Sequence, residues 1–204
     1  MNERGMIFNA EMVRAILDGR KTQTRRPIKW KQTRFTEIAE RDDGSLWPWA
    51  EDCERGGDIW FACPYGEIGD RIWVRETFRV HSRATDVATL VYRASVRNSW
   101  TEQTHRVPVE VCNTPATPEK WTPSIHMPRW ASRITLEITG VRVERLNSIT
   151  ESDAEAEGVT DTGFGDLLVD GYRYLWKYIY GEESWAANPW VWVIEFKRVE
   201  GGAA

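Results

Sequence analysis

Cysteine and histidine are scarce in this sequence and show no pattern. The three cysteines lie far apart with no C-x-x-C pair, and the three histidines add no metal-ligand spacing. A disulfide framework and a structural zinc site are therefore not expected. We predict that the protein requires no metal.

Long apolar runs and nucleotide-binding loops are also absent. The first ten residues lack the apolar core of a signal peptide, and no apolar run approaches membrane length. Neither a GxGxxG fingerprint nor a Walker loop occurs, so nothing supports a nucleotide cofactor. We expect a cytoplasmic protein with no cofactor and no membrane contact.

The overall charge is mildly acidic, but its distribution is uneven. A net charge of −4 argues against a bulk polyanion binder. Between Arg20 and Arg34, however, there are seven basic residues and no acidic one. This segment is suited to a phosphate or a nucleic-acid backbone. The alternative interpretation is a solvated strand edge.

The chain is also unusually rich in tryptophan, with twelve among 204 residues. Indole rings serve either core packing or stacking on bases. Both uses stay open for Trp73 and Trp130, and His126 is either a base contact or an ordinary loop histidine. Arg26, Glu76 and Arg129 are candidates for reading base edges or phosphate, with ordinary ion pairing as the alternative.

The candidate chemistry lies where a helix gives way to a strand. Apolar residues between Asn9 and Leu17 recur at helical spacing, with Asn9 as N-cap and Gly19 as stop. The alternation from Thr22 to Arg26 then predicts a strand ended by Pro27. A hydroxyl near an ammonium, as in Thr24 and Lys21, is typical of covalent catalysis. The alternative is a basic turn followed by a strand threonine.

The later sequence predicts two helices and a closing strand. The helices are expected at Leu146–Gly158, with Ser148 and Glu151 at capping-box spacing, and at about Asp166–Tyr180. The last strand is expected at Trp190–Val199. Glu157 would stand at a helix C-terminus, or it is one more solvated helix carboxylate.

These elements predict an α+β protein: a small mixed β-barrel flanked by two or three helices. We expect one domain over residues 1–200 with a flexible tail at 201–204. Two segments, about 28–58 and 79–122, are interpreted as insertions. The first is expected to hold little regular structure, and the second only a strand at Thr89–Arg93.

Several separated blocks resemble the ASCH domains, which are related to the PUA RNA-binding fold. The blocks are Gly19–Arg26, Gly69–Val74, Leu146–Glu151, Ala156–Gly158 and Val193–Phe196. The first and last resemble the short bacterial N4-acetylcytidine amidohydrolases, which share a Gly-Arg-Lys-Thr-x-Thr-x-Arg run and an Ile-Glu-Phe-Lys ending. This resemblance covers about half of the chain.

A longer phage and prophage ASCH group is similar over nearly the whole chain. The shared segments are Pro123–Arg133 and Asn188–Trp192. The amidohydrolases lack the two insertions, so their presence here leaves the substrate more open than the chemistry.

The resemblance to the amidohydrolases implies a catalytic set. By motif position, the nucleophile falls on Thr24, the assisting lysine on Lys21 and the glutamate on Glu157. It implies an amidohydrolase that removes an acyl group from N4-acylated cytosine, as a nucleoside or in RNA. Either Lys21 or Glu157 would be the general base, with Lys21 otherwise stabilising the oxyanion.

Two other functions stay open. PUA-type barrels often bind RNA or modified bases without catalysis, and the basic segment and the tryptophans would serve that role. A metal-independent ribonuclease is a third alternative. The sequence does not decide the acyl group or the oligomeric state.

Overall fold

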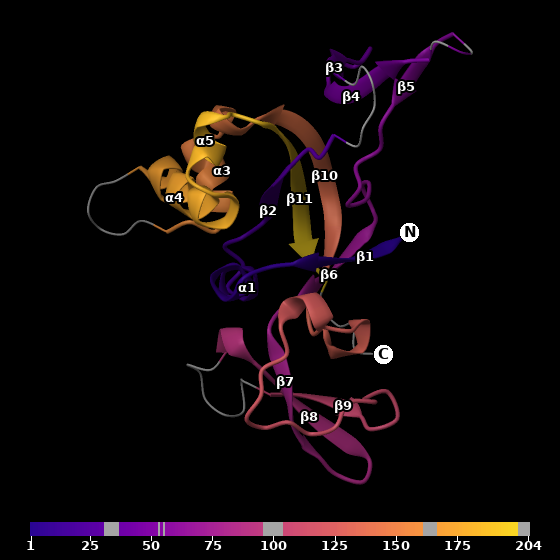
Figure 1. Ribbon diagram of the computed structural model, residues 1–204, viewed down its shortest axis with the longest axis vertical. Helices are drawn as coiled ribbons and strands as arrows, with labels where there is room; N and C mark the ends of the chain where they lie inside the picture. Colours follow the sequence, from indigo (N-terminus) through magenta and orange to yellow (C-terminus); the bar gives the residue numbers. More distant parts are fainter. Residues whose placement is uncertain (31–36, 53, 55, 96–103, 161–166, 200–204) are drawn as a thin grey trace. The chain divides into compact units, whose positions relative to one another are not determined.

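The computed structural model describes residues 1–30, 37–52, 54, 56–95, 104–160 and 167–199 (Figure 1). The predictions for the tail at 201–204, for parts of both insertions (31–36, 53, 55 and 96–103) and for Asp166 lie outside these residues. Within them, helices and strands are mixed, which confirms the α+β class. None of the described helices is long and apolar enough to cross a membrane.

The helices and strands have the following bounds. The helices are α1 (Ala10–Leu17), α3 (Glu151–Ala156), α4 (Leu168–Tyr180) and α5 (Glu183–Ala186). The strands are β1 (Glu3–Ile7), β2 (Gln23–Pro27), β3 (Glu37–Glu40), β4 (Leu46–Glu51), β5 (Asp58–Trp60), β6 (Arg71–Arg75), β7 (Phe78–Arg83), β8 (Val87–Tyr92), β9 (Thr104–Pro108), β10 (Thr135–Arg145) and β11 (Trp190–Arg198). Short 3₁₀ turns lie at Arg93–Ser95, Ser124–His126, Arg129–Ala131 and Leu146–Ser148.

The chain divides into two compact units, each assembled from separate segments. The first comprises Met1–Gly19, Asp70–Glu137 and Arg198–Ala204, and the second comprises Arg20–Gly69 and Ile138–Lys197.

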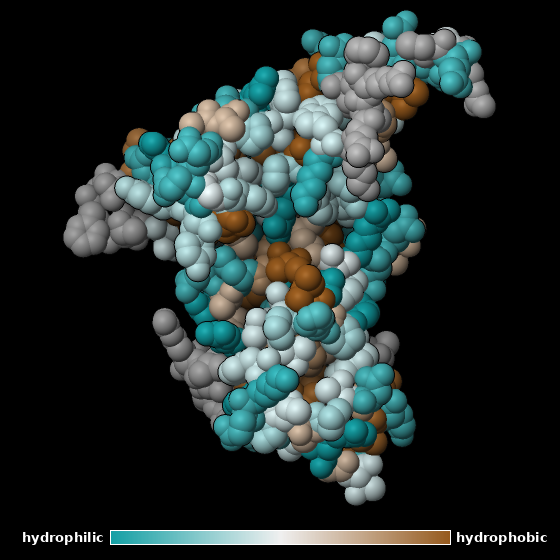
Figure 2. Space-filling view, in the orientation of Figure 1, coloured by the Kyte–Doolittle hydropathy of each residue, from teal (hydrophilic) through white to brown (hydrophobic). Residues whose placement is uncertain are grey.

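On the face drawn in Figure 2, most exposed residues are hydrophilic, and hydrophobic residues reach the surface in separate spots. This pattern is ordinary for a folded chain in water.

In the first unit, β1 pairs in parallel with β6, and β6 pairs antiparallel with the first residues of β10. A separate sheet has the order β7-β8-β9. Its strands contribute Phe78, Leu90 and Tyr92 to a hydrophobic core. The prediction of only one strand between residues 79 and 122 is therefore wrong. Val80 of β7 is buried, and Ala88 and Leu90 are buried at alternate positions of β8. The polar residues beside them made this period hard to recognise in the sequence.

In the second unit, the sheet order is β10-β11-β2. Helices α3, α4 and α5 cluster beside these strands (Figure 1). Their core joins Leu146, Tyr172 and Trp176 to Val191 and Val193 of β11. The near-continuous apolar run of the last strand is thus explained, because four successive residues from Val191 to Ile194 are buried.

The first insertion is more ordered than predicted. Its described part contains the strands β3 and β4, which pair with β5 in a three-stranded sheet, so the expectation of little regular structure is wrong. Pro48 occupies the central strand β4, opposite Ile38, where proline is uncommon and argued against a strand. Its carbonyl still accepts a hydrogen bond from the Phe61 backbone N–H at 2.9 Å.

The predicted helix ends hold for α1 but shift for α3. The Asn9 side chain accepts a hydrogen bond from the Met12 backbone N–H, and Gly19 has a φ of +76°. At α3, the capping box uses Thr150 and Asp153, so the prediction of Ser148 and Glu151 is wrong. Residues 146–148 instead form a 3₁₀ turn that delays the helix.

A close contact between the Gly5 backbone and Trp73 in the first unit yields a stability prediction. A Cβ added at Gly5 would lie 2.6 Å from Cζ2 and 2.8 Å from Cε2 of the Trp73 indole. We expect Gly5→Ala to lower the free energy of unfolding by about 1–3 kcal/mol, because the indole has to move. Urea denaturation measures this loss. The exposed neighbour Ile7 supplies the control: Ile7→Thr should stay within about 0.5 kcal/mol of the parent.

Candidate functional site

A buried ion pair joins two of the three predicted catalytic residues. Lys21 Nζ lies 2.7 Å from Glu157 Oε2 and donates a second hydrogen bond, at 2.8 Å, to the Glu157 backbone carbonyl. Both residues are 2% exposed. The structure therefore brings together side chains that are 136 positions apart in the sequence. The alternative interpretation of Glu157 as a solvated helix carboxylate is wrong.

Backbone hydrogen bonds hold the two residues in place. Thr22 N–H donates to the Ala156 carbonyl at 2.8 Å, and the Phe196 N–H donates to the Thr22 carbonyl at 2.8 Å. The turn before β2 is thereby fixed between the end of α3 and strand β11. Glu157 is the C-cap of α3, as predicted, and Gly158 follows with a φ of +88°. This local geometry aims the carboxylate at Lys21.

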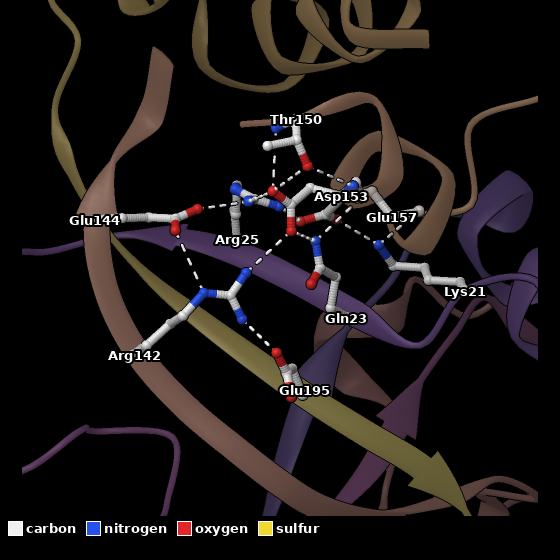
Figure 3. Close-up of polar contacts among 9 residues, drawn as sticks. All are labelled: Lys21, Gln23, Arg25, Arg142, Glu144, Thr150, Asp153, Glu157 and Glu195. Atoms are coloured by element: carbon white, nitrogen blue, oxygen red, sulfur yellow. Dashed lines mark hydrogen bonds and ion pairs between the residues drawn. The ribbon is translucent and has the colours of Figure 1, made fainter. Parts of the chain in front are cut away.

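Arg25 extends the pair into a larger charged cluster (Figure 3). Its guanidinium lies 3.2 Å from Glu157 Oε1 and 3.2 Å from Asp153 Oδ2, and it also binds Glu144. Because Arg25 is 2% exposed, these contacts offset the cost of removing its charge from water. Lys21 and Arg25, two residues of the basic segment, are thus buried. The alternative interpretation of this segment as a solvated strand edge is therefore wrong for both of them.

The outer part of the cluster is more exposed. Arg142 lies 3.0 Å from Asp153 and 3.3 Å from Glu144, and it also binds Glu195. The Gln23 side-chain amide donates to Asp153 Oδ1 at 3.1 Å. The complete cluster contains three cations and four carboxylates: Lys21, Arg25 and Arg142 with Glu144, Asp153, Glu157 and Glu195.

Burial changes the proton affinity of Lys21. Loss of hydration lowers the pKa of its ammonium and outweighs the opposing effect of the Glu157 carboxylate. The positive charges of Arg25 and Arg26 lower the pKa further. A lysine in such surroundings gives up its proton more readily than one in water, which suits a proton-transfer role.

Thr24 is also buried, but it lies on the other face of β2. Gln23 and Arg25 both contact Asp153, and successive strand residues point to opposite faces. Thr24 therefore faces away from α3, opposite Ile194 of β11. The described contacts of Lys21 and Glu157 do not include the Thr24 hydroxyl.

Arg26 lies on the same face of β2 as Thr24. In the β2–β11 register, Arg26 is opposite Trp192, and Trp192 and Ile194 share a face. Its charge acts on Lys21 and on Tyr65, where it opposes the burial that raises the pKa of that phenol. Of the predicted binding residues, Arg26 alone belongs to the same unit as the three catalytic candidates.

The other five predicted binding residues belong to the first unit. Glu76 is buried and paired with Arg133 at 2.9 and 3.0 Å, and burial raises the pKa of its carboxyl. The Arg133 guanidinium also lies 4.0 Å from the centre of the Tyr92 ring. Glu76 and Tyr92 together hold Arg133 in place. The ion-pair alternative describes Glu76 well.

Arg129, Trp73, Trp130 and His126 differ in exposure. Arg129 is paired with Glu3 at 2.8 Å through two nitrogens, and its guanidinium lies 6.0 Å from the centre of the Trp73 ring. Trp130 packs edge-on against Phe78 at 6.3 Å. His126 is exposed at the end of a 3₁₀ turn. Core packing accounts for Trp130 and the ion-pair alternative describes Arg129, whereas Trp73 is only partly buried.

Sequence reasoning missed most of the charged cluster. Gln23, Glu144, Asp153 and Glu195 were not singled out, because on their own they read as ordinary polar positions of strands and a short helix. The alternation of Lys21, Gln23 and Arg25 was the available signal, since same-face polar residues on a buried strand require partners. Among the described residues, no group of three His, Cys, Asp or Glu side chains is placed to hold a metal.

The buried pair makes a testable contribution to stability. We expect Glu157→Gln to lower the free energy of unfolding by about 3–5 kcal/mol, because it leaves Lys21 and Arg25 without their buried counter-charge. Combining it with Lys21→Met should cost less than the sum of the two single changes. Chemical denaturation of the four proteins measures the coupling. Additive losses would contradict it, and Glu155→Gln, on the exposed side of α3, is the matched control.

Asp153 should make the fold sensitive to acid. Burial tends to raise the pKa of its carboxyl, but hydrogen bonds from Thr150 and Gln23 and the charge of Arg25 hold it well below the usual value. The unfolded chain therefore takes up this proton first, and the stability from Asp153 is lost as the pH falls below about 4. We expect Asp153→Asn to flatten the decline in unfolding free energy between pH 6 and pH 3. An equally steep decline would refute this, and the exposed Asp170→Asn is the control.

Comparison with known proteins gives one structural likeness. No family model matches the chain, and no curated protein matches it. Its structure is similar to the crystal structure of an ASCH domain from Lactobacillus crispatus JV V101, with a TM-score of 0.41 and 13% sequence identity. The likeness covers 97% of this chain and 79% of that one.

Proposed function

We propose that this protein is an amide hydrolase that removes the acyl group from N4-acylated cytosine, using Thr24, Lys21 and Glu157. The observation that carries the proposal is the buried contact of 2.7 Å between Lys21 Nζ and Glu157 Oε2. A lysine with a lowered pKa beside a carboxylate forms a proton-transfer pair. Thr24, three positions from the lysine, supplies the hydroxyl.

The proposed reaction has two steps. The Thr24 oxygen attacks the acyl carbon while its proton passes to the base. The bond from the acyl carbon to N4 then breaks, and the leaving nitrogen takes a proton. Water next attacks the acyl-threonine ester, releasing the carboxylic acid and restoring the hydroxyl. For the first step, the base must come within about 2.6–3.2 Å of the hydroxyl. In the free protein Glu157 holds Lys21 Nζ on the α3 side of β2, whereas Thr24 faces the other side. The mechanism therefore requires the turn before β2 to rearrange on substrate binding, so that the base reaches the hydroxyl.

Two assignments of the base remain within this proposal. If Lys21 is neutral, its nitrogen accepts the threonine proton, and Glu157 orients it. If Lys21 stays charged, it stabilises the oxyanion and Glu157 takes the proton. The first assignment agrees with the direction of the Lys21 pKa shift. It also agrees with the position of Arg25, whose guanidinium lies 3.2 Å from Glu157 Oε1.

A second candidate is a non-catalytic module that binds RNA or modified bases. The observation that favours it is the near-complete burial of Lys21, Thr24 and Glu157, each 2% exposed. Side chains that are buried and mutually satisfied are typical of structural ion pairs as well as of catalytic sites. In this reading, the charged cluster only holds β2 against α3.

Hydrolysis of N4-acetylcytidine, as a nucleoside and within a short RNA, distinguishes the two candidates. We expect the protein to release cytidine, and the change in absorbance measures this release. Thr24→Val, which keeps the shape and removes the nucleophile, should abolish turnover, while Thr24→Ser should retain it. Lys21→Ala should lower kcat by about 100-fold or more.

The folded state of each variant is a necessary control, because all three residues are buried. Circular dichroism and thermal melting establish whether a loss of activity reflects chemistry or unfolding. No turnover of either substrate by the parent protein would overturn the proposal. So would an unchanged rate in a folded Thr24→Val variant.

A further inference from the structure

A pocket with aromatic walls lies in the second unit, apart from the Lys21–Glu157 contact. It measures about 320 Å³ and lies between the end of β2, strand β11 and the inserted β3-β4-β5 region. Its walls include the rings of Trp30, Phe61, Tyr65 and Trp192, and Lys29 contributes a positive charge. None of these residues was named individually as a site residue, although Lys29 lies in the basic segment at Arg20–Arg34.

The walls of the pocket are held by contacts behind them. Trp192 is 2% exposed and packs edge-on against Trp47, with ring centres 5.0 Å apart. The Trp47 indole N–H donates to the Phe61 carbonyl at 2.7 Å. The Arg41 guanidinium lies 4.2 Å above the Trp47 ring. The insertion thus fixes two pocket walls through one tryptophan, and a pocket formed in advance loses less entropy on binding.

The pocket differs from an ordinary core gap in its rim and its charge. Trp30 is 43% exposed, so this lining indole is not packed away in a core. Lys29 lines the pocket, Arg26 acts electrostatically on Tyr65, and none of the lining residues is acidic. Flat apolar walls with a positive edge suit a planar ring that carries an anionic group.

We propose that this pocket binds the base of a nucleotide, with the ring between the aromatic walls and the phosphate near Lys29. A volume of about 320 Å³ is at the lower end of the range of small-ligand pockets. The ligand is either a free mononucleotide or one base of a single-stranded nucleic acid, because both present the same ring and phosphate. The site does not depend on the hydrolysis proposed above.

The register of β2 and β11 gives the pocket a relation to Thr24. Trp192 is opposite Arg26, Ile194 is opposite Thr24, and all four residues share one face of the strand pair. A base held at Trp192 would therefore lie on the face of β2 that carries the Thr24 hydroxyl. The Lys21–Glu157 contact is on the α3 side.

Calorimetric titration of the full-length protein tests the pocket. The probes are cytidine 5′-monophosphate, adenosine 5′-monophosphate, cytidine, ribose 5-phosphate and an oligothymidylate. We expect at least one probe with both a base and a phosphate to bind, and cytidine and ribose 5-phosphate to bind at least fivefold more weakly than that probe. Binding of the mononucleotides identifies a free nucleotide as the ligand. Binding of the oligothymidylate alone, weakened by salt, identifies single-stranded nucleic acid.

Variants separate the pocket from the rest of the surface. Trp30→Ala should weaken binding of the tightest probe by about tenfold, because it removes a stacking wall. Lys29→Gln should remove the preference for the phosphate. Tyr174→Ala, an exposed ring of α4, and Lys120→Gln, an exposed lysine, are matched controls and should bind as the parent does.

The proposal fails if no probe binds, or if Trp30→Ala binds as tightly as the parent. Equal binding of cytidine and its monophosphate would also overturn it, because the charged edge would then be without function. The titration is independent of catalysis. It measures binding of probes that carry no acyl group, so a failure of the hydrolase proposal leaves this test intact.

Discussion

The structure of the second unit depends on burying the charges of Lys21 and Arg25. Moving an ammonium or guanidinium out of water costs several kcal/mol unless opposite charges and hydrogen bonds replace the water. Glu157 reaches both cations, with oxygens at 2.7 and 3.2 Å, and therefore ties the turn before β2 to the end of α3. A displacement of α3 would leave Lys21 without its carboxylate and Arg25 with Glu144 alone. The same constraint that stabilises the fold lowers the pKa of the lysine.

The two faces of β2 have different surroundings. On the α3 side, Gln23 and Arg25 meet carboxylates of the charged cluster. On the other side, Thr24 and Arg26 share a face with Trp192, which lines the aromatic pocket. One short strand thus carries a charged cluster on one face and an alcohol beside an aromatic surface on the other. A hydrolase would use both faces, whereas a binding module would need only the second.

The first insertion contributes structure as well as sequence length. Its β3-β4-β5 sheet presents Trp47 to Trp192 and positions Phe61 at the pocket wall. The sequence predicted little regular structure for this insertion. Its Trp47 ring instead packs against Trp192 of β11, and β4 accommodates Pro48.

Local pattern alone determined the α+β class, the ends of α1, the positions of β2, α4 and β11, and the place of Glu157 at a helix end. Those features depend on neighbours within a few residues, such as the Asn9 cap and the positive φ of Gly19. The tertiary structure alone decided that Lys21 meets Glu157, that Arg25 is buried, and that part of an insertion lines a pocket together with β11. The physical reason is that the energy of a buried charge or ring depends on partners distant in sequence, which no local periodicity records.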